Sequence, residues 1–115
     1  MKILFNYKKK KISLEVRKIP KIFEGIGLMF SSKNTKPVLF SFKKSIKLKI
    51  HSYFVFYKFL ALWFDEDMKL IDKKIIKPFQ LGISPSRKFK YLVEIPFNSN
   101  SDEVLKFLVG QERFK

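Results

Sequence analysis

The sequence predicts a small, mostly β protein: a single sandwich-like or barrel-like domain over residues 1–115, with one or two short helices. Short segments in which apolar and polar residues alternate recur along the chain, as in half-buried strands. Other segments are dense in aromatic and β-branched residues, and turn residues separate them at short intervals. Hydrophobic residues make up 46% of the 115 residues, which is enough for one core without disulfides.

Two strands joined by a lysine-rich turn are predicted at the N-terminus. The first covers residues 2–7, which are mostly apolar or aromatic. The second covers residues 12–19, where Ile12, Leu14 and Val16 share one face. The four lysines between them, Lys8–Lys11, are expected at the hairpin connection, where a run of charge is most often only solvated.

A short helix is predicted over residues 19–24. Pro20 favours the first turn of a helix, and Gly25 and Gly27 favour its end. These glycines lack the third glycine of a dinucleotide-binding loop, and that loop precedes a helix instead of following one. We therefore expect the GLMF segment, residues 27–30, to re-enter the core instead of binding phosphate.

The remaining elements follow from periodicity and from turn residues. Strands are predicted over residues 38–42, 46–50, 51–57, 59–64, 68–77 and 89–96, and a helix over 101–110. In the last strand Val93 and Ile95 share one face, and Glu94 lies on the other. Ser101 is the expected N-cap of the helix, and Gly110 is its expected end.

The charge of the chain points to polyanions. It has 25 lysine and arginine residues against 10 acidic ones, a formal net charge of +15. Such a field favours nucleic acid, anionic lipid or an acidic protein. Arginine occurs only at Arg17, Arg87 and Arg113, so base-specific reading, which prefers arginine, is not expected. A lysine-rich composition also arises from genome bias or from adaptation to heat.

Several classes of site are not expected. The chain has no cysteine, so it has no disulfide, thiolate nucleophile or cysteine zinc site, which fits a reducing cytoplasm. Its single histidine, His51, lacks partners at metal-ligand spacing, and no serine nucleophile elbow accompanies it. The acidic turn at residues 65–67 lacks the spacing of an EF-hand. We expect no catalytic residue, no metal and no cofactor.

Neither a signal peptide nor a membrane span is predicted. The N-terminal apolar run is too short for a signal peptide and no small-residue cleavage site follows it. The longest apolar stretch, residues 53–64, is interrupted by Lys58 and is shorter than the roughly 20 residues of a spanning helix. We therefore expect a soluble, cytoplasmic protein.

Several segments together resemble a known family. In order, they are GLMF at 27–30, VLFSF at 38–42, IHSYFVF at 50–56, LALWFD at 60–65, KP at 77–78, YLVEIP at 91–96 and LVGQ at 108–111. Their order and spacing are similar to those of the uncharacterised family known as domain of unknown function 192, or uncharacterised protein family 0127, in the form with I-H-x-x-F that archaeal members often have. The resemblance spans most of the chain. It implies a small, mostly β, sandwich-like domain without an established activity.

Two positions depart from the pattern of that family. Ser31 stands where the family usually has arginine after GLMF. No Pro-x-Asp lies between the aromatic segment and the strand that follows it. Two polar groups that could serve a common pocket of the family are therefore absent from this chain.

Three functions compete at this point. The first is a non-enzymatic basic binding module for a polyanion, with RNA or a ribonucleoprotein as the expected partner. Its expected binding residues are Lys8, Lys9, Lys10, Lys11, Lys43, Lys44, Lys47 and Lys49. The alternative is a small-ligand-binding or enzymatic domain with a pocket near the GLMF loop that includes Met29, His51 and Glu94. The third, contact with an anionic membrane surface, requires an apolar tip beside the charge.

Overall fold

The computed structural model describes residues 1–19, 36–50, 52, 55–98 and 102–110. Within these residues the chain is mostly β, as predicted. The strands are β1 (Lys2–Tyr7), β2 (Lys10–Glu15), β3 (Arg17–Lys18), β4 (Val38–Ile46), β5 (Phe59–Phe64), β6 (Leu70–Ile76) and β7 (Phe89–Pro96). One helix, α1 (Asp102–Val109), follows them.

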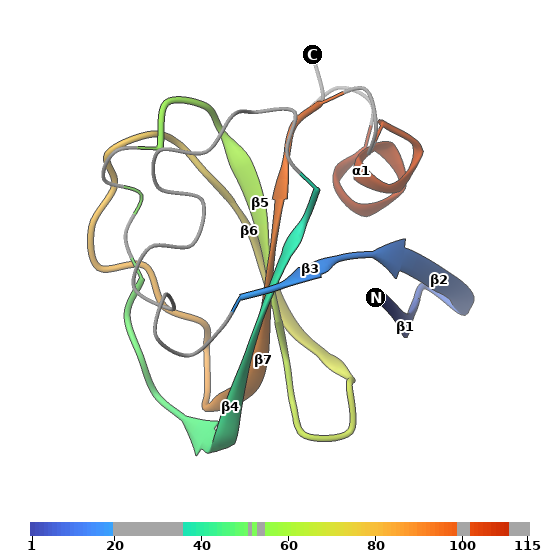
Figure 1. Cartoon of the computed structure of the whole chain (residues 1–115), viewed down its shortest axis with the longest axis horizontal. Coiled ribbons are helices and arrows are strands. Elements are labelled where there is room, and N and C mark those ends of the chain that lie inside the picture. Colours follow the sequence, from blue (N-terminus) through green and yellow to red (C-terminus); the bar gives the residue numbers. More distant parts are fainter. Residues whose placement is uncertain (20–35, 51, 53–54, 99–101, 111–115) are drawn as a thin grey trace.

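The strands form two sheets. β1 and β2 make an antiparallel hairpin, and the other five strands form a sheet in the order β3-β4-β7-β5-β6 (Figure 1). β3 pairs with β4 in parallel, and all other neighbours are antiparallel. Among the described residues β3 and β6 are the edges of this sheet, so it does not close into a barrel, and the barrel-like alternative was wrong.

Strand β5 lies inside the five-stranded sheet and is buried on both faces. All six of its residues are buried. Leu60, Leu62 and Phe64 belong to the apolar core on one face. Phe59 and Trp63, with the intervening alanine, belong to the core on the other face. This double burial explains why residues 59–64 read as a continuous apolar run and not as an alternation.

The β1-β2 hairpin and α1 cover one face of the sheet, and both lie on the same side of it in Figure 1. Ile3 and Phe5 enter the core and alternate along β1 with exposed residues, which include the apolar Leu4. The Phe5 and Phe64 rings meet edge to face, with centroids 5.0 Å apart. Leu105 and Leu108 bring α1 into the same core. This packing places the turn end of the hairpin beside the helix.

The second predicted strand, residues 12–19, consists of two strands that belong to different sheets. β2 ends at Glu15, and β3 begins at Arg17 as the edge of the five-stranded sheet. At the buried residue between them, Val16, the backbone N–H still bonds to the Met1 carbonyl, at 2.7 Å. The Arg17 N–H bonds instead to the Pro37 carbonyl, at 2.8 Å. The alternation at residues 12–19 therefore continues across both sheets, and the prediction of one strand was wrong.

Two predicted strands are not found where they were expected. β4 runs on to Ile46, and Lys47, Leu48 and Lys49 lie outside any strand with exposed side chains. Their alternation therefore does not reflect burial on one face of a sheet. In the segment 51–57 the described residues 52 and 55–57 form no strand. Ser52 instead bonds through its backbone to the turn at residues 79–80.

Three other element predictions are confirmed. β6 lies within the predicted range of 68–77, and β7 matches the predicted range of 89–96. In β7, Val93 and Ile95 enter the core on the sheet face that α1 covers. α1 ends at Gly110, whose φ is +83° and whose N–H bonds to the Lys106 carbonyl at 2.9 Å. Several predictions fall outside the described residues: the two glycines, the GLMF segment, Ser101 and most of the helix at 19–24. Of that predicted helix only Ile19 is described, and it is buried next to β4.

The acidic turn between β5 and β6 has a structural role. The Asp65 carboxylate accepts hydrogen bonds from the backbone N–H groups of Asp67 and Lys69, both at 2.9 Å. These bonds close the turn through one side-chain oxygen. Among the described residues no group of acidic or histidine side chains is arranged to hold a metal ion.

Candidate functional site

The β1-β2 turn consists of two lysines in a strained backbone conformation. Tyr7 pairs with Lys10 across the hairpin, so Lys8 and Lys9 form a two-residue loop. Their φ angles are 51° and 65°, which makes this a type I′ geometry that strongly prefers Asn-Gly. Both lysine side chains are exposed. The chain thus places two positive charges at a position where other residues would cost less backbone strain.

Beside this turn, three lysines surround a pair of aromatic rings. Tyr7 on β1 and Phe107 on α1 meet edge to face, with ring centroids 5.6 Å apart and an angle of 90°. The Lys8 and Lys73 ammonium groups each lie 5.5 Å from the Tyr7 centroid. The Lys10 ammonium lies 5.0 Å from the Phe107 centroid. We call Tyr7, Lys8, Lys10, Lys73 and Phe107 the lysine–aromatic surface.

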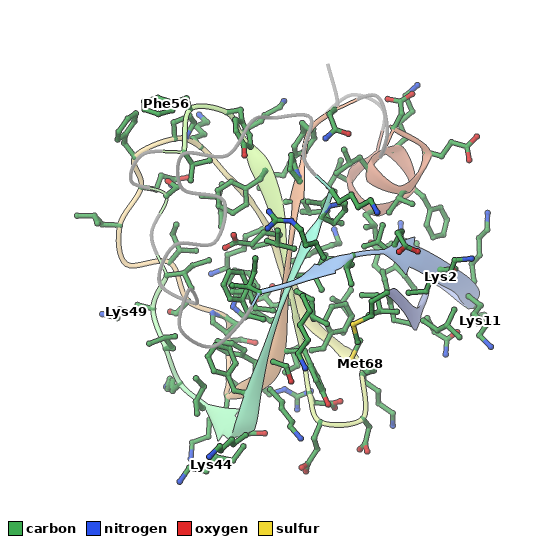
Figure 2. The ribbon with its side chains drawn as sticks, in the orientation of Figure 1. Lys2, Lys11, Lys44, Lys49, Phe56 and Met68 are labelled. Carbon is green, nitrogen blue, oxygen red and sulfur yellow. The ribbon has the colours of Figure 1, made fainter. Side chains whose placement is uncertain are left out.

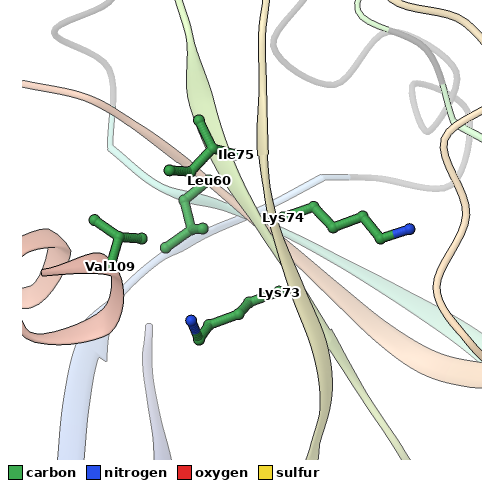
Figure 3. A pocket seen from close by; sticks show the side chains of 5 residues that line it. All are labelled: Leu60, Lys73, Lys74, Ile75 and Val109. Atoms are coloured by element: carbon green, nitrogen blue, oxygen red, sulfur yellow. The ribbon is translucent and has the colours of Figure 1, made fainter. Parts of the chain in front are cut away.

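A groove of about 370 Å³ adjoins this surface between β6 and α1 (Figure 3). It is lined by Leu60, Lys73, Lys74, Ile75 and Val109. Figure 3 shows the two lysine side chains diverging: Lys73 extends toward the α1 side and Lys74 away from it. Lys74 is engaged elsewhere, because its ammonium donates to the Ser84 carbonyl at 2.6 Å. The Lys73 side chain thus lines the groove, and its ammonium group lies near the Tyr7 ring.

The charge of the lysine–aromatic surface is not neutralised within the described part of the chain. The two ion pairs found there join Met1 to Glu15 and Lys106 to Asp102. Neither includes Lys8, Lys10 or Lys73. A cation–π contact leaves an ammonium its full charge, so these three groups can meet an external anion.

The second predicted lysine cluster lies far from the first. Lys43, Lys44, Lys47 and Lys49 are all exposed. In Figure 2, Lys44 and Lys49 lie on the left and Lys11 on the right, along the longest dimension of a molecule that measures 32 Å. The structure therefore groups Lys8 and Lys10 with Lys73 and separates them from the second cluster.

Three members of the lysine–aromatic surface escaped the sequence analysis: Tyr7, Lys73 and Phe107. One signal was available, because Tyr7 directly precedes the lysine run and occupies an inward-facing position of the first strand. The meeting of this strand end with β6 and α1 joins residues far apart in the sequence. No local pattern contains that information.

Glu94 is the one residue of the predicted GLMF pocket that the structure describes, because Met29 and His51 fall outside the described residues. Its side chain is 5% exposed, and its neighbours across β4 and β5 are Val38 and Ala61. It thus lies on the sheet face opposite α1, as its place in the alternation predicted. The sequence left its burial open, and the structure shows it buried.

A tyrosine with a perturbed pKa lies near Glu94. Burial and then the Glu94 carboxylate raise the pKa of Tyr57 to about 12, against a smaller opposing effect of Arg17. The buried Tyr57 hydroxyl and the buried Trp63 indole N–H have no hydrogen-bond partner among the described residues. These groups give this face of the sheet a polar character that an apolar core would lack.

An exposed apolar tip is also present. The Phe56 and Phe79 rings are 64% and 50% exposed and meet edge to face at 5.6 Å, and Leu81 is exposed nearby in sequence. Phe79 has a φ of 60°. The buried Ser52 fixes this turn: its hydroxyl donates to the Lys77 carbonyl at 2.6 Å, and its carbonyl accepts from the Phe79 N–H at 3.0 Å. In Figure 2, Phe56 lies at the opposite end from Lys11.

In residues 1–19, 36–50, 52, 55–98 and 102–110, no helix has the length and apolar character needed to cross a bilayer.

Comparisons with known proteins identify structures of similar fold. No family model matches the chain. No curated protein matches it either. A protein of unknown function from Novosphingobium aromaticivorans has a similar structure, with a TM-score of 0.68 and 8% identity, over 90% of this chain and 76% of that one. A "putative transcription regulator" from Sinorhizobium meliloti has a TM-score of 0.65 and 14% identity, over 88% of this chain and 81% of that one.

Proposed function

We propose that this protein is a non-enzymatic binding module for a polyanion, with RNA or a ribonucleoprotein in the cytoplasm as its partner. The observation that carries the proposal is the lysine–aromatic surface. Three ammonium groups without an ion-pair partner in the described chain converge there on two partly exposed rings. Clustered lysines of this kind contact phosphates and release their counterions.

The strained turn supports the same proposal. Lys8 and Lys9 occupy left-handed conformations at an exposed loop, where asparagine and glycine would be more stable. Strain of this kind is often retained where it places a functional side chain. We take it as a sign that the charge at this turn matters more than the stability it costs.

The other predicted lysines extend the binding region. Lys9 and Lys11 continue the charge around the hairpin, whereas Lys43, Lys44, Lys47 and Lys49 lie at the far end of the molecule. A small anion cannot contact both ends. A nucleic acid repeats its phosphates along its length, so a long strand can.

The comparisons neither add to nor oppose this proposal. The Sinorhizobium meliloti protein of similar fold carries the name "putative transcription regulator". A shared fold at 14% identity does not transfer a function. Membership of the domain of unknown function 192 family likewise stays a prediction from the quoted motifs, and that family implies no activity.

The proposal is tested by fluorescence anisotropy at several salt concentrations, with a structured RNA too short to contact both ends of the molecule. A triple variant, Lys8→Ser, Lys10→Ser and Lys73→Ser, should flatten the log–log salt slope by roughly two units, since each phosphate contact contributes about 0.7 to 0.9. The matched control changes Lys44, Lys47 and Lys49 to serine, which removes the same charge at the far end and should have a smaller effect. Absence of binding at low salt, or equal losses from the two triple variants, contradicts the proposal.

The exposed apolar tip favours a second candidate function, contact with an anionic membrane. Phe56, Phe79 and Leu81 supply the apolar signal that charge alone lacks, and the net charge of +15 supplies the other. Sedimentation with vesicles that contain phosphatidylserine tests it. If this candidate is correct, binding depends on phosphatidylserine, and Phe56→Ser with Phe79→Ser releases the protein. Retention of the double variant on the vesicles contradicts it.

A further inference from the structure

We infer that the lysine–aromatic surface and its groove bind unpaired nucleotides, with a base stacked on Tyr7 or Phe107 and the adjoining phosphate on Lys73. The inference rests on the proposed function and narrows it. A binding module for any polyanion needs only charge. The arrangement of rings, ammonium groups and groove adds features that charge alone does not require.

The two rings provide a platform for stacking. Tyr7 and Phe107 are partly exposed, although the strand and the helix that carry them are otherwise packed into the core through their buried residues. The Lys8 and Lys73 ammonium groups lie near the Tyr7 ring, and lysine side chains are flexible enough to move aside. Stacking of a base on an aromatic ring is generally stronger than a solvent-exposed cation–π contact. A base can therefore take the place of an ammonium, which then pairs with the phosphate of the same nucleotide.

Lys73 connects the ring to the groove. Its side chain lines the groove while its ammonium remains 5.5 Å from the Tyr7 centroid. The groove is floored by the fully buried Leu60, and Ile75 and Val109 add partly exposed apolar walls. Its volume of about 370 Å³ lies within the usual range for small-ligand sites. Apolar residues beside the lysines of the groove match the flat, weakly polar faces of a nucleoside next to its phosphate.

An unpaired strand fits these features better than a duplex. Bases inside a duplex are stacked on each other, and a protein reaches their faces only when they are unpaired. The surface carries lysine and no arginine, the residue whose planar guanidinium suits bidentate contacts to base edges best. We therefore expect a preference for single strands with little preference for sequence.

The test compares three fluorescein-labelled probes on the intact protein: a short single-stranded oligouridylate, an RNA duplex of the same length, and inorganic polyphosphate. The double variant Tyr7→Leu and Phe107→Leu keeps every lysine. It should weaken binding of the single strand about 10-fold or more, because each stacked base contributes substantially. Binding of polyphosphate should change by less than about 2-fold, since it depends on charge alone. The salt slope should stay the same.

A matched control removes a ring elsewhere. Phe56→Leu changes an exposed aromatic residue at the opposite end of the molecule and should leave all three affinities unchanged. Tyr7→Phe keeps the ring and should retain binding of the single strand. A second measurement needs no variant: an oligonucleotide with 4-thiouridine is crosslinked to the wild-type protein and the adduct is mapped. We expect it on Tyr7 or Phe107.

The outcomes separate the inference from the proposed function. If none of the three probes binds at low salt, the proposed function itself is wrong. A different result would contradict the inference alone. Polyphosphate and the single strand both bind the wild-type protein, and the double variant either weakens the two affinities equally or leaves both unchanged. In that case the lysines bind the probes without base stacking, and the inference is wrong. Adducts confined to other residues would contradict it as well.

Discussion

At the scale of single residues, the backbone at Lys8 and Lys9 is the feature most closely tied to the proposed function. Four described residues other than glycine have a positive φ, and two of them are these adjacent lysines. The other two, Met68 and Phe79, lie in turns fixed by Asp65 and by Ser52. In the described part of the chain the strand pairing of the hairpin holds the backbone of the lysine turn, and the contact that substitution of the lysines would remove is that of Lys8 with the Tyr7 ring.

Replacement of both turn lysines should separate stability from binding. The double variant Lys8→Asn and Lys9→Gly places the preferred residues in the type I′ turn and should raise the free energy of unfolding by about 1 kcal/mol or more. Denaturant unfolding measures this. The same variant should bind RNA more weakly, because it removes two charges from the turn.

The control makes the same substitutions where φ is not positive. Lys47→Asn with Lys49→Gly is expected to give no stabilisation, because neither lysine has a left-handed backbone. Equal stabilities of the hairpin variant and the wild type would show that the turn is not strained.

Tyr57 gives the protein a pH dependence on the alkaline side. Its pKa is raised to about 12 by burial first and by Glu94 second, whereas an unfolded tyrosine has a pKa of about 10. The folded state therefore favours the neutral phenol. The stabilisation is fully present below pH 10 and is lost as the pH rises from about 10 through 12.

The comparison of wild type with Tyr57→Phe isolates this effect. Phenylalanine cannot ionise, so the variant should gain stability relative to the wild type as the pH rises above about 10. Below that pH the variant should be no less stable, since the buried hydroxyl has no hydrogen-bond partner in the described chain. Unfolding free energies at matched pH values measure the difference. A difference that does not vary with pH would refute the assignment of the raised pKa.

At the scale of elements, the end of α1 shows how one residue fixes a boundary. Gly110 has a φ of +83° and closes the helix through the bond to Lys106. A Cβ at this position would meet no other atom within 4 Å, so space does not limit the side chain. Any cost of substitution must come from the backbone conformation.

Gly110→Ala should therefore lower the free energy of unfolding by about 1 kcal/mol. Gly110→Asn is the matched control, because asparagine tolerates the left-handed conformation and should lose less. Thermal unfolding of both variants measures the difference. If alanine and asparagine behave alike, the left-handed backbone does not determine the helix end.

The same scale shows what the sequence could predict. Residues 59–64 and 89–96 were assigned correctly because their composition matches their burial in the sheet. The alternation after Ile46 was misleading, because Lys47, Leu48 and Lys49 are exposed and belong to no strand. The break at Val16 was missed because one alternating run continues from the hairpin into the edge of the sheet. An alternation of apolar and polar residues indicates which side chains are buried. It does not indicate the sheet in which each part of the segment pairs.

The candidate site was predicted only in part for a related reason. Lys8 and Lys10 stand out in the sequence as members of a charged run. Lys73 is one lysine among many, and Tyr7 and Phe107 read as ordinary core residues. Their meeting depends on the packing of β1, β6 and α1, which joins the start, the middle and the end of the chain.

At the scale of the whole molecule, the lysine–aromatic surface and the second lysine cluster lie at opposite ends. The lysine–aromatic surface occupies the end with the hairpin and α1, and the second lysine cluster occupies the other (Figures 1 and 2). A net charge of +15 attracts polyanions to any face at low salt. What distinguishes the proposed site is the combination of charge with partly exposed rings and a groove.

The most direct test of this account is a titration of the isotope-labelled wild-type protein with a short single-stranded RNA at moderate salt, followed by backbone amide NMR. We predict that the largest shift changes fall on Tyr7–Lys10, on Lys73 and its neighbours in β6, and on Phe107–Val109 at the end of α1. Changes concentrated at Lys43–Lys49, or small changes spread evenly over all exposed lysines, would contradict the assignment of the binding site.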